Sequence, residues 1–235
     1  HPVVYRPNGK GMAFALFVRP VTDGQVIEKG NRIVIKGASY LTLISSTATG
    51  FLGYDQMPLT DRKQVVQKAM QQVMDAGTDV SKLKKEHIED YKALFSRQDF
   101  SLHTDRSGRT DKLLKDPAAF QAVCELLYHY GKYLMISGSR RGGQPLNLQG
   151  QWNANIRPAW SSNYTVNINT QMNYWGASLC GLQECLEPYL RMVHEVCKRG
   201  EKTAKVNYGC RGFACNHNVD LWRKTAPVIG ESNYM

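Results

Sequence analysis

The segment from residue 147 to residue 175 has the composition of a ligand-binding loop. It contains seven asparagines, three tryptophans and no acidic side chain. Amides both donate and accept hydrogen bonds, and indole faces stack on the apolar face of a sugar ring. The segment therefore indicates a carbohydrate site, with Trp152, Trp160 and Trp175 as candidate stacking residues. The alternative is a structural role for any one of these residues: a tryptophan would then belong to the core, and an asparagine would cap a turn or a helix.

A second polar group, His217, Asn218 and Asp220, lies further along the chain. We interpret it as a network that fixes a loop or orients a substrate. No third ligand stands at a recognisable spacing, so the sequence predicts neither a metal nor another cofactor. The six cysteines all fall in the second half without a Cys-x-x-Cys pair. Buried free thiols are the favoured interpretation, although their even number leaves disulfides open.

Several strings in this region resemble glycoside hydrolase family 95, the inverting 1,2-α-L-fucosidase family. They are residues 147–152 (NLQGQW), 164–169 (YTVNIN), 172–175 (MNYW), 210–213 (CRGF) and 217–227 (HNVDLWRKTAP). The similarity extends upstream to residues 90–95 (DYKALF), which resemble the family's linker helix, and to residues 37–54, which resemble its last β-domain strands.

The resemblance implies an active site in which paired asparagines, Asn167 and Asn169, hold and polarise the attacking water. Their spacing has a physical sense, because side chains two residues apart in an extended segment point the same way. An amide is a poor base, so the family uses a carboxylate behind the asparagines and a separate glutamic acid that protonates the leaving oxygen. Both of those residues come later in the family's chain than any residue of this sequence.

The substrate implied by the resemblance is a fucosylated or L-galactose-containing oligosaccharide. Members of the family carry His or Thr two residues before the first asparagine, and this choice tracks the preference for L-fucose or L-galactose; here the residue is Thr165. The expected substrate-binding set is Thr165, Trp152, Trp160, Trp175, His217, Asn218 and Asp220. A non-catalytic carbohydrate-binding fragment is the rival interpretation from another class.

The elements that must position these residues change from strands to helices along the chain. Apolar alternation and turn signals predict four strands in the first fifty residues and a short fifth one later, and apolar residues at helical spacing between caps and glycines predict the helices. The expected strands are 12–18 (ended by Pro20), 25–27, 32–36, 40–45 and a short one at 100–103; the expected helices are 60–77, 80–95, 116–138, 168–179, 184–199 and 201–208.

This order predicts a multidomain α+β chain. By resemblance, residues 1–54 are the last strands of an N-terminal antiparallel β-sandwich, 55–115 a helical linker, and 116–235 the first part of an (α/α)6 barrel. The net charge of +10 is only partly clustered, so nucleic acid is not an expected partner. No window is apolar enough for membrane insertion, and the first residues do not resemble a signal peptide. The sequence does not determine the oligomeric state. It does not determine the compartment either, although a secreted or periplasmic location is slightly favoured.

Overall fold

The computed structural model describes residues 11–105, 107–156 and 158–228. The chain divides into two compact units, His1–Ile88 and Glu89–Met235, with the division inside helix α2 (Val80–Phe95). The first unit is mainly β and the second mainly α, which confirms the α+β class at that coarse level. Within the described ranges, no helix has the length and apolar character needed to cross a membrane.

The first unit is built on two antiparallel strand pairs. Strand β1 (Phe14–Thr22) pairs with β4 (Leu41–Thr49), and β2 (Gln25–Lys29) pairs with β3 (Arg32–Lys36). The expectation that Pro20 ends the first strand is wrong, since β1 continues through Pro20, which lies opposite Leu43. A two-stranded sheet leaves one side of each strand unpaired, and an edge strand tolerates a residue without a backbone N–H.

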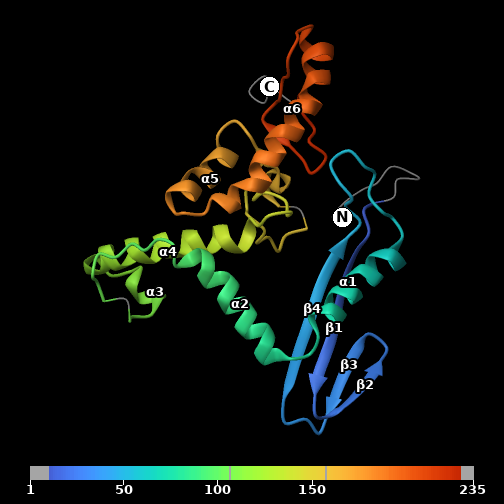
Figure 1. Cartoon of the computed structure of the whole chain (residues 1–235), viewed down its shortest axis with the longest axis vertical. Coiled ribbons are helices and arrows are strands. Elements are labelled where there is room, and N and C mark those ends of the chain that lie inside the picture. Colours follow the sequence, from blue (N-terminus) through green and yellow to red (C-terminus); the bar gives the residue numbers. More distant parts are fainter. Residues whose placement is uncertain (1–10, 106, 157, 229–235) are drawn as a thin grey trace. The chain divides into compact units, whose positions relative to one another are not determined.

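Helix α1 (Arg62–Ala76) covers one face of the β1–β4 pair, and Figure 1 shows it lying along these strands. The helix begins where the sequence predicts, because the Asp61 carboxylate accepts a hydrogen bond from the Lys63 N–H and so serves as its N-cap. It ends at Gly77, whose φ of +73° favours glycine. The core between helix and sheet consists of Ala13, Ala48, Val65 and Ala69, with Ala15, Phe17 and Leu59 packed against it.

The second unit holds the predicted helices together with a very small sheet. Its elements are α3 (Thr110–Leu113), α4 (Phe120–Gly138), α5 (Asn169–Leu179) and α6 (Glu187–Tyr208), the 3-10 turns Pro117–Ala119, Ala159–Ser162 and Gln183–Leu186, and the strands β5 (Tyr164–Thr165) and β6 (Asn218–Val219). One core cluster joins α2, α4 and α5 through Leu94, Ile136 and Ala177. A second joins β5 and β6 to α6 through Tyr164, Val219 and Met192.

Two predicted elements of this unit are wrong. Residues 100–103 form no strand; instead the Leu102 N–H donates to the buried carboxylate of Glu125, which tethers this segment to α4. The helices expected at 184–199 and 201–208 are one continuous helix, α6, preceded by a 3-10 turn. Gly200 does not break α6, because its missing side chain makes room for the loop beyond. A Cβ at Gly200 would lie 2.8 Å from the carbonyl oxygen of Ala214.

All six cysteines lie in the described ranges and are free thiols, in line with the favoured interpretation. Their expected burial holds fully only for Cys185. Cys210 is exposed and the other four are half-buried.

Candidate active site

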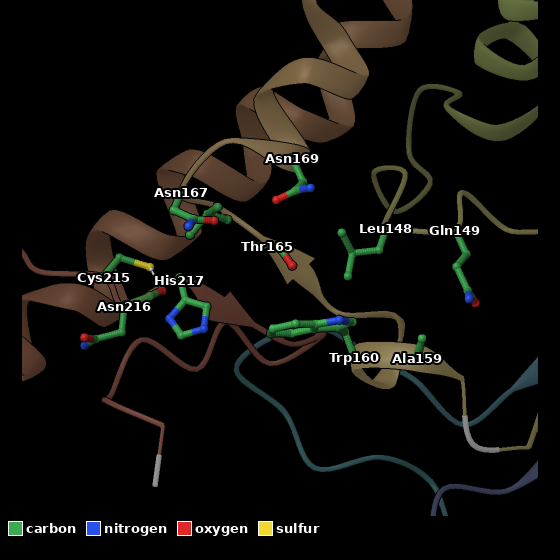
Figure 2. Close-up of a pocket in the computed structure, with 11 residues that line it drawn as sticks. Leu148, Gln149, Ala159, Trp160, Thr165, Asn167, Asn169, Cys215, Asn216 and His217 are labelled. Atoms are coloured by element: carbon green, nitrogen blue, oxygen red, sulfur yellow. Dashed lines mark hydrogen bonds between the residues drawn. The ribbon is translucent and has the colours of Figure 1, made fainter. Parts of the chain in front are cut away.

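A cavity of about 720 Å³ in the second unit is lined by residues from three segments. They are the long loop after α4 (Leu148, Gln149, Ala159, Trp160), the segment that runs from β5 into α5 (Thr165, Val166, Asn167, Asn169) and the segment before β6 (Cys215, Asn216, His217). Figure 2 shows these side chains around the pocket. The lining combines amides, an indole, a hydroxyl and an imidazole, and none of its described residues carries a carboxylate.

The pairing of β5 with β6 brings two of these segments together. Tyr164 lies opposite Val219 and Thr165 opposite Asn218, and the ladder continues with a 2.8 Å hydrogen bond from the Val166 N–H to the His217 carbonyl. Tyr164 and Val219 are buried against α6, and burial raises the pKa of Tyr164 to about 12, so its hydroxyl stays neutral. The anchored pair therefore fixes where the following pocket residues lie.

Asn167 and Asn169 present free amides to the pocket. Both side chains are exposed, and within the described ranges neither has a hydrogen-bond partner. Ile168 between them is the N-cap of α5, with an extended φ of −169° and no side-chain capping bond. Figure 2 shows both amides on the pocket side of this segment. The alternative that the two asparagines serve as turn or helix caps finds no hydrogen bond to support it.

The hydroxyl of Thr165 lies at the buried end of the pocket, where the side chain is only 7% exposed. It donates to the Asn163 amide oxygen at 2.6 Å, and the Asn163 amide nitrogen donates to Asn218 at 2.7 Å. A hydroxyl that donates one bond still accepts others through its lone pairs. Asn163 matches a glycosylation pattern in the sequence, but both polar atoms of its amide are engaged in this network.

Trp160 is held in the pocket by a backbone in an unusual conformation. Trp160, Ser161 and Ser162 have φ values of 55°, 54° and 50°, a left-handed turn that costs roughly 1–2 kcal/mol per residue for L-amino acids. The Ser162 hydroxyl is close enough to hydrogen-bond Gln149 at 3.1 Å and Asn147 at 3.3 Å, which ties the turn to the loop. The indole is 58% exposed, and Figure 2 shows its ring extending below Thr165 toward His217. Strain of this kind is concentrated at functional sites.

Four of the nine predicted site residues lie outside the pocket lining. Trp152 packs against Gly138 and Gly150, whose missing side chains leave room for its ring. Trp175 lies on α5 and is 63% exposed. The Asn218 side chain accepts a hydrogen bond from the Asn163 amide, and its backbone lies opposite Thr165 in the β5–β6 pair. Asp220 fixes its own turn, because its carboxylate accepts from the Trp222 N–H at 2.9 Å and the Lys224 N–H at 3.0 Å.

Sequence reasoning missed several lining residues, among them Gln149, Cys215 and Asn216. Gln149 lies inside a string that carries the resemblance, and the other two directly precede His217, so proximity to these motifs was the available signal. Burial is the main cause that raises the pKa of Cys215 to about 11, and the neighbouring Cys197 is the second cause. Its thiol is therefore protonated at neutral pH and poorly suited to nucleophilic attack. Asn216 is held by its amide, which donates to the Thr225 carbonyl at 2.9 Å.

The described part of the chain contains no group of three or more His, Cys, Asp or Glu side chains that could hold a metal ion. What the pocket offers is hydrogen bonding and stacking. That chemistry suits a neutral sugar, whose hydroxyls need both donors and acceptors.

A family model described as the glycosyl hydrolase family 95 catalytic domain matches residues 79–235, which include every residue of the pocket. The chain belongs to glycosyl hydrolase family 95. This membership agrees with the resemblance seen in the motifs.

Three curated relatives of this family 95 chain are named as fucosidases. Alpha-L-fucosidase 2 of Arabidopsis thaliana is 33% identical over 95% of this chain and 28% of its own length. A probable alpha-fucosidase A of Aspergillus oryzae is 29% identical over 94% of this chain and 33% of its own length. Another, of Aspergillus niger, is 36% identical over 62% of this chain and 19% of its own length. The chain thus spans a third or less of each relative's length.

Proposed function

We propose that this chain supplies the water-holding and sugar-binding part of the active site of an α-L-fucosidase that hydrolyses its substrate with inversion. The observation that carries the proposal is the pair of unpartnered amides, Asn167 and Asn169, in a pocket that also presents an indole. The pocket lies wholly within the part of the chain that matches the family 95 catalytic domain, and the relatives' names as fucosidases support the choice of sugar.

The two amides act on the attacking water in this mechanism. Their carbonyl oxygens accept its hydrogens and orient a lone pair toward the anomeric carbon of the sugar. A positioned reactant of this kind lowers the barrier because its orientation is fixed before the reaction. The amide nitrogens remain available as donors to a sugar hydroxyl.

Among the residues that the structure describes, the pocket lining holds no carboxylate that could serve as general base or general acid. An inverting glycosidase needs both, on opposite sides of the bond that is cleaved and roughly 6.5–9.5 Å apart. We infer that the catalytic glutamic acid and the activating aspartate come from outside this chain, as the family resemblance implies. The carboxylate of the activating aspartate, placed behind Asn167 and Asn169, would make the water that they hold nucleophilic. Neutral amides cannot do this alone.

The remaining lining residues fit a deoxy sugar with one apolar patch. The Trp160 indole offers a face for the side of the ring that carries C–H groups and, in L-fucose, for the C6 methyl. Thr165 and His217 provide polar contacts at the buried end. Asn218 and Asp220 would act indirectly, by holding the segments that carry Thr165 and His217.

An α-L-galactosidase is the second candidate, and Thr165 is the observation that favours it. L-Galactose differs from L-fucose by a hydroxyl at C6. The Thr165 hydroxyl already donates to Asn163, so it is free to accept a hydrogen bond from that added group. A site that pairs with a substrate hydroxyl discriminates strongly against the analogue without it.

A non-catalytic carbohydrate-binding fragment is the third candidate, because the described pocket lining offers sugar contacts but no carboxylate for hydrolysis. The same pocket serves all three candidates, and only the surrounding chain distinguishes them. Direct measurement of turnover is therefore required.

We also propose the family architecture for the whole chain, with residues 1–54 ending a β-sandwich, 55–115 forming a linker and 116–235 beginning an (α/α)6 barrel. On the face of the β1–β4 sheet opposite α1, Phe14, Leu16 and Leu43 are exposed, as the inner face of a sandwich would be without its second sheet. Leu127 on α4 and Leu179 on α5 are similarly exposed, as they would be without neighbouring barrel helices.

The test is hydrolysis of 2′-fucosyllactose by the full-length protein that carries this sequence, followed by proton NMR from the first seconds of reaction. The proposal expects β-L-fucose as the first product, since inversion converts an α-linkage into a β-hemiacetal. α-L-Fucose as the first product would refute inversion. Binding of fucose without turnover would support the fragment, and faster cleavage of p-nitrophenyl α-L-galactoside than of the fucoside would support the galactosidase.

A further inference from the structure

Arg223 is the largest fully buried side chain in the described part of the chain, with 1% of its surface exposed. It does not line the main pocket. A buried guanidinium is costly unless it is paired and its donors are satisfied. The partners of Arg223 therefore show which segments this buried guanidinium holds together.

The guanidinium joins the segments that form the pocket. Its Nε donates to the Glu195 carboxylate on α6 at 2.8 Å, and one terminal nitrogen donates to the Gln144 side chain in the loop after α4 at 2.7 Å. The other terminal nitrogen reaches the carbonyls of Asp220 and Leu221, just after β6, at 3.3 and 3.2 Å.

A fourth contact ties Arg223 to β5. The central carbon of the guanidinium lies 5.6 Å from the centroid of the Tyr164 ring, a cation–π distance. Tyr164 is adjacent to Thr165, and the segment then continues to Asn167 and Asn169. One buried cation thus contacts β5 and the segment just after β6, as well as α6 and the long loop.

The backbone of Arg223 is also strained. Its φ of 56° is in the left-handed region, which apart from glycine only four other residues in the described ranges adopt, three of them in the Trp160 turn of the pocket. A turn bond from the Arg223 N–H to the Asp220 carbonyl, 3.1 Å long, accompanies this conformation. Backbone strain persists where the surrounding contacts over-determine it.

We propose that Arg223 is a positioning residue for the reaction: it fixes the β5–β6 pair, and through it the water-holding amides of Asn167 and Asn169, relative to the rest of the pocket. This inference rests on the proposed function. It requires arginine specifically, because only a planar guanidinium reaches a carboxylate, an amide oxygen, two carbonyls and a ring face at once. Lysine would keep the charge but lose the fork.

The principal test is Arg223→Lys in the full-length protein, measured as kcat and KM separately on 2′-fucosyllactose. We expect kcat to fall by about 10- to 100-fold, the loss typical of a reacting group displaced by about 1 Å. KM should change by less than about threefold, because the Trp160 indole, which stacks on the sugar, is held by its own left-handed turn and not by Arg223.

Arg97→Lys is the matched control. Arg97 makes a similar set of bonds, to Glu184 and to the carbonyls of Ala93 and Gly181, but outside the pocket. Its substitution should lower the melting temperature without lowering the kcat of the folded protein. Equal effects of the two substitutions on kcat would overturn the positioning role, as would a kcat within twofold of wild type for folded Arg223→Lys.

Chemical rescue gives a second readout that a purely structural role would not produce. Arg223 also borders a cavity of about 340 Å³ between α6 and the loop after β6, which offers a small cation a way to the vacated site in Arg223→Ala. Added guanidinium at millimolar concentration should restore kcat several-fold in Arg223→Ala but not in Arg97→Ala. If Arg223→Ala does not fold, Glu195→Gln keeps the arginine and weakens its strongest bond, and an unchanged kcat in that variant would overturn the proposal.

Hydrogen exchange separates this inference from the proposed function. Arg223→Lys should speed exchange at the amides of residues 164–166 and 217–219 and leave α4 unchanged. If the wild-type protein hydrolyses no fucoside while this exchange pattern appears, the proposed activity fails and the coupling of Arg223 to the strand pair stands. If the wild type is active and exchange in both segments is unchanged by Arg223→Lys, the positioning role fails.

Discussion

Replacing Asn167 or Asn169 by alanine should impair catalysis without impairing folding. Within the described ranges neither amide has a hydrogen-bond partner, so truncation removes no protein–protein bond. Both side chains are exposed, and exposed substitutions away from special features usually change stability by less than about 0.5 kcal/mol. The transition state, in contrast, would lose one of the two groups that orient its water.

The expected loss in kcat is about 100- to 1,000-fold for each substitution, or roughly 2.7–4 kcal/mol, the range measured when one preorganised polar group is removed from an active site. In the proposed mechanism the two amides act on the same water, so the double substitution should cost less than the sum of the two single ones.

Asn173→Ala is the matched control for these variants. Asn173 lies one turn further along α5, does not line the pocket, and donates to the Asn147 carbonyl at 3.1 Å. Losing that bond should destabilise the protein by about 1 kcal/mol while the folded enzyme keeps its kcat. The assay is kcat on 2′-fucosyllactose, with thermal unfolding of the same samples. The reasoning is refuted if Asn167→Ala and Asn169→Ala keep kcat within threefold, or if they lower stability as much as Asn173→Ala does.

Three further predictions follow from other contacts. Thr165→His should shift the kcat/KM ratio toward α-L-fucosides over α-L-galactosides by about 10- to 100-fold, because the imidazole fills the space of a 6-hydroxyl and the threonine hydroxyl that would pair with it is lost. An unchanged ratio on matched p-nitrophenyl glycosides would show that Thr165 does not determine specificity. Gly200→Ala should destabilise the protein by about 1–3 kcal/mol in thermal unfolding, since the new methyl group would lie 2.8 Å from the Ala214 carbonyl, and an unchanged melting temperature would contradict that packing. A hydrogen bond from Arg97, first among several causes, lowers the pKa of Glu184 to about 2. The ionised carboxylate therefore stabilises the folded state at pH values above its ordinary pKa of about 4.5, and this stabilisation is lost as the pH falls from about 4.5 to about 2. The difference in melting temperature between wild type and Glu184→Gln should therefore shrink over this interval, and a constant difference would show that the ion pair does not titrate as described.

Much of the fold could be predicted from local signals. The caps at Asp61 and the stop at Gly77 act within one turn of a helix, so the limits of α1 follow from the sequence. Gly200 resembles a helix break because it is a glycine inside a helical pattern, and only the approach of Ala214 from a distant loop explains why a glycine stands there. Residues 100–103 alternate like a strand, but Glu125, more than twenty residues away, supplies the hydrogen-bond acceptor that a neighbouring strand would have provided.

The site was predicted in part, for a similar reason. The family resemblance pairs Asn167 with Asn169, in agreement with their spacing, and composition indicates Trp160 as one of three candidate sugar-stacking residues. Composition could not separate Trp160 from Trp152 and Trp175, because the difference lies in the left-handed turn that holds Trp160 at the pocket and in the two glycines that seat Trp152 elsewhere. The burial of Arg223 was equally invisible, since its partners come from four segments of the chain.

The most direct test of the central claim is a crystal structure of the full-length protein with an iminosugar analogue of L-fucose. The account predicts the sugar ring against the Trp160 indole, and a single water within hydrogen-bond distance of both the Asn167 and Asn169 amide oxygens, on the face of the ring opposite the leaving group. An analogue bound in another cavity, or bound here with the two amides directed away from any such water, would contradict it.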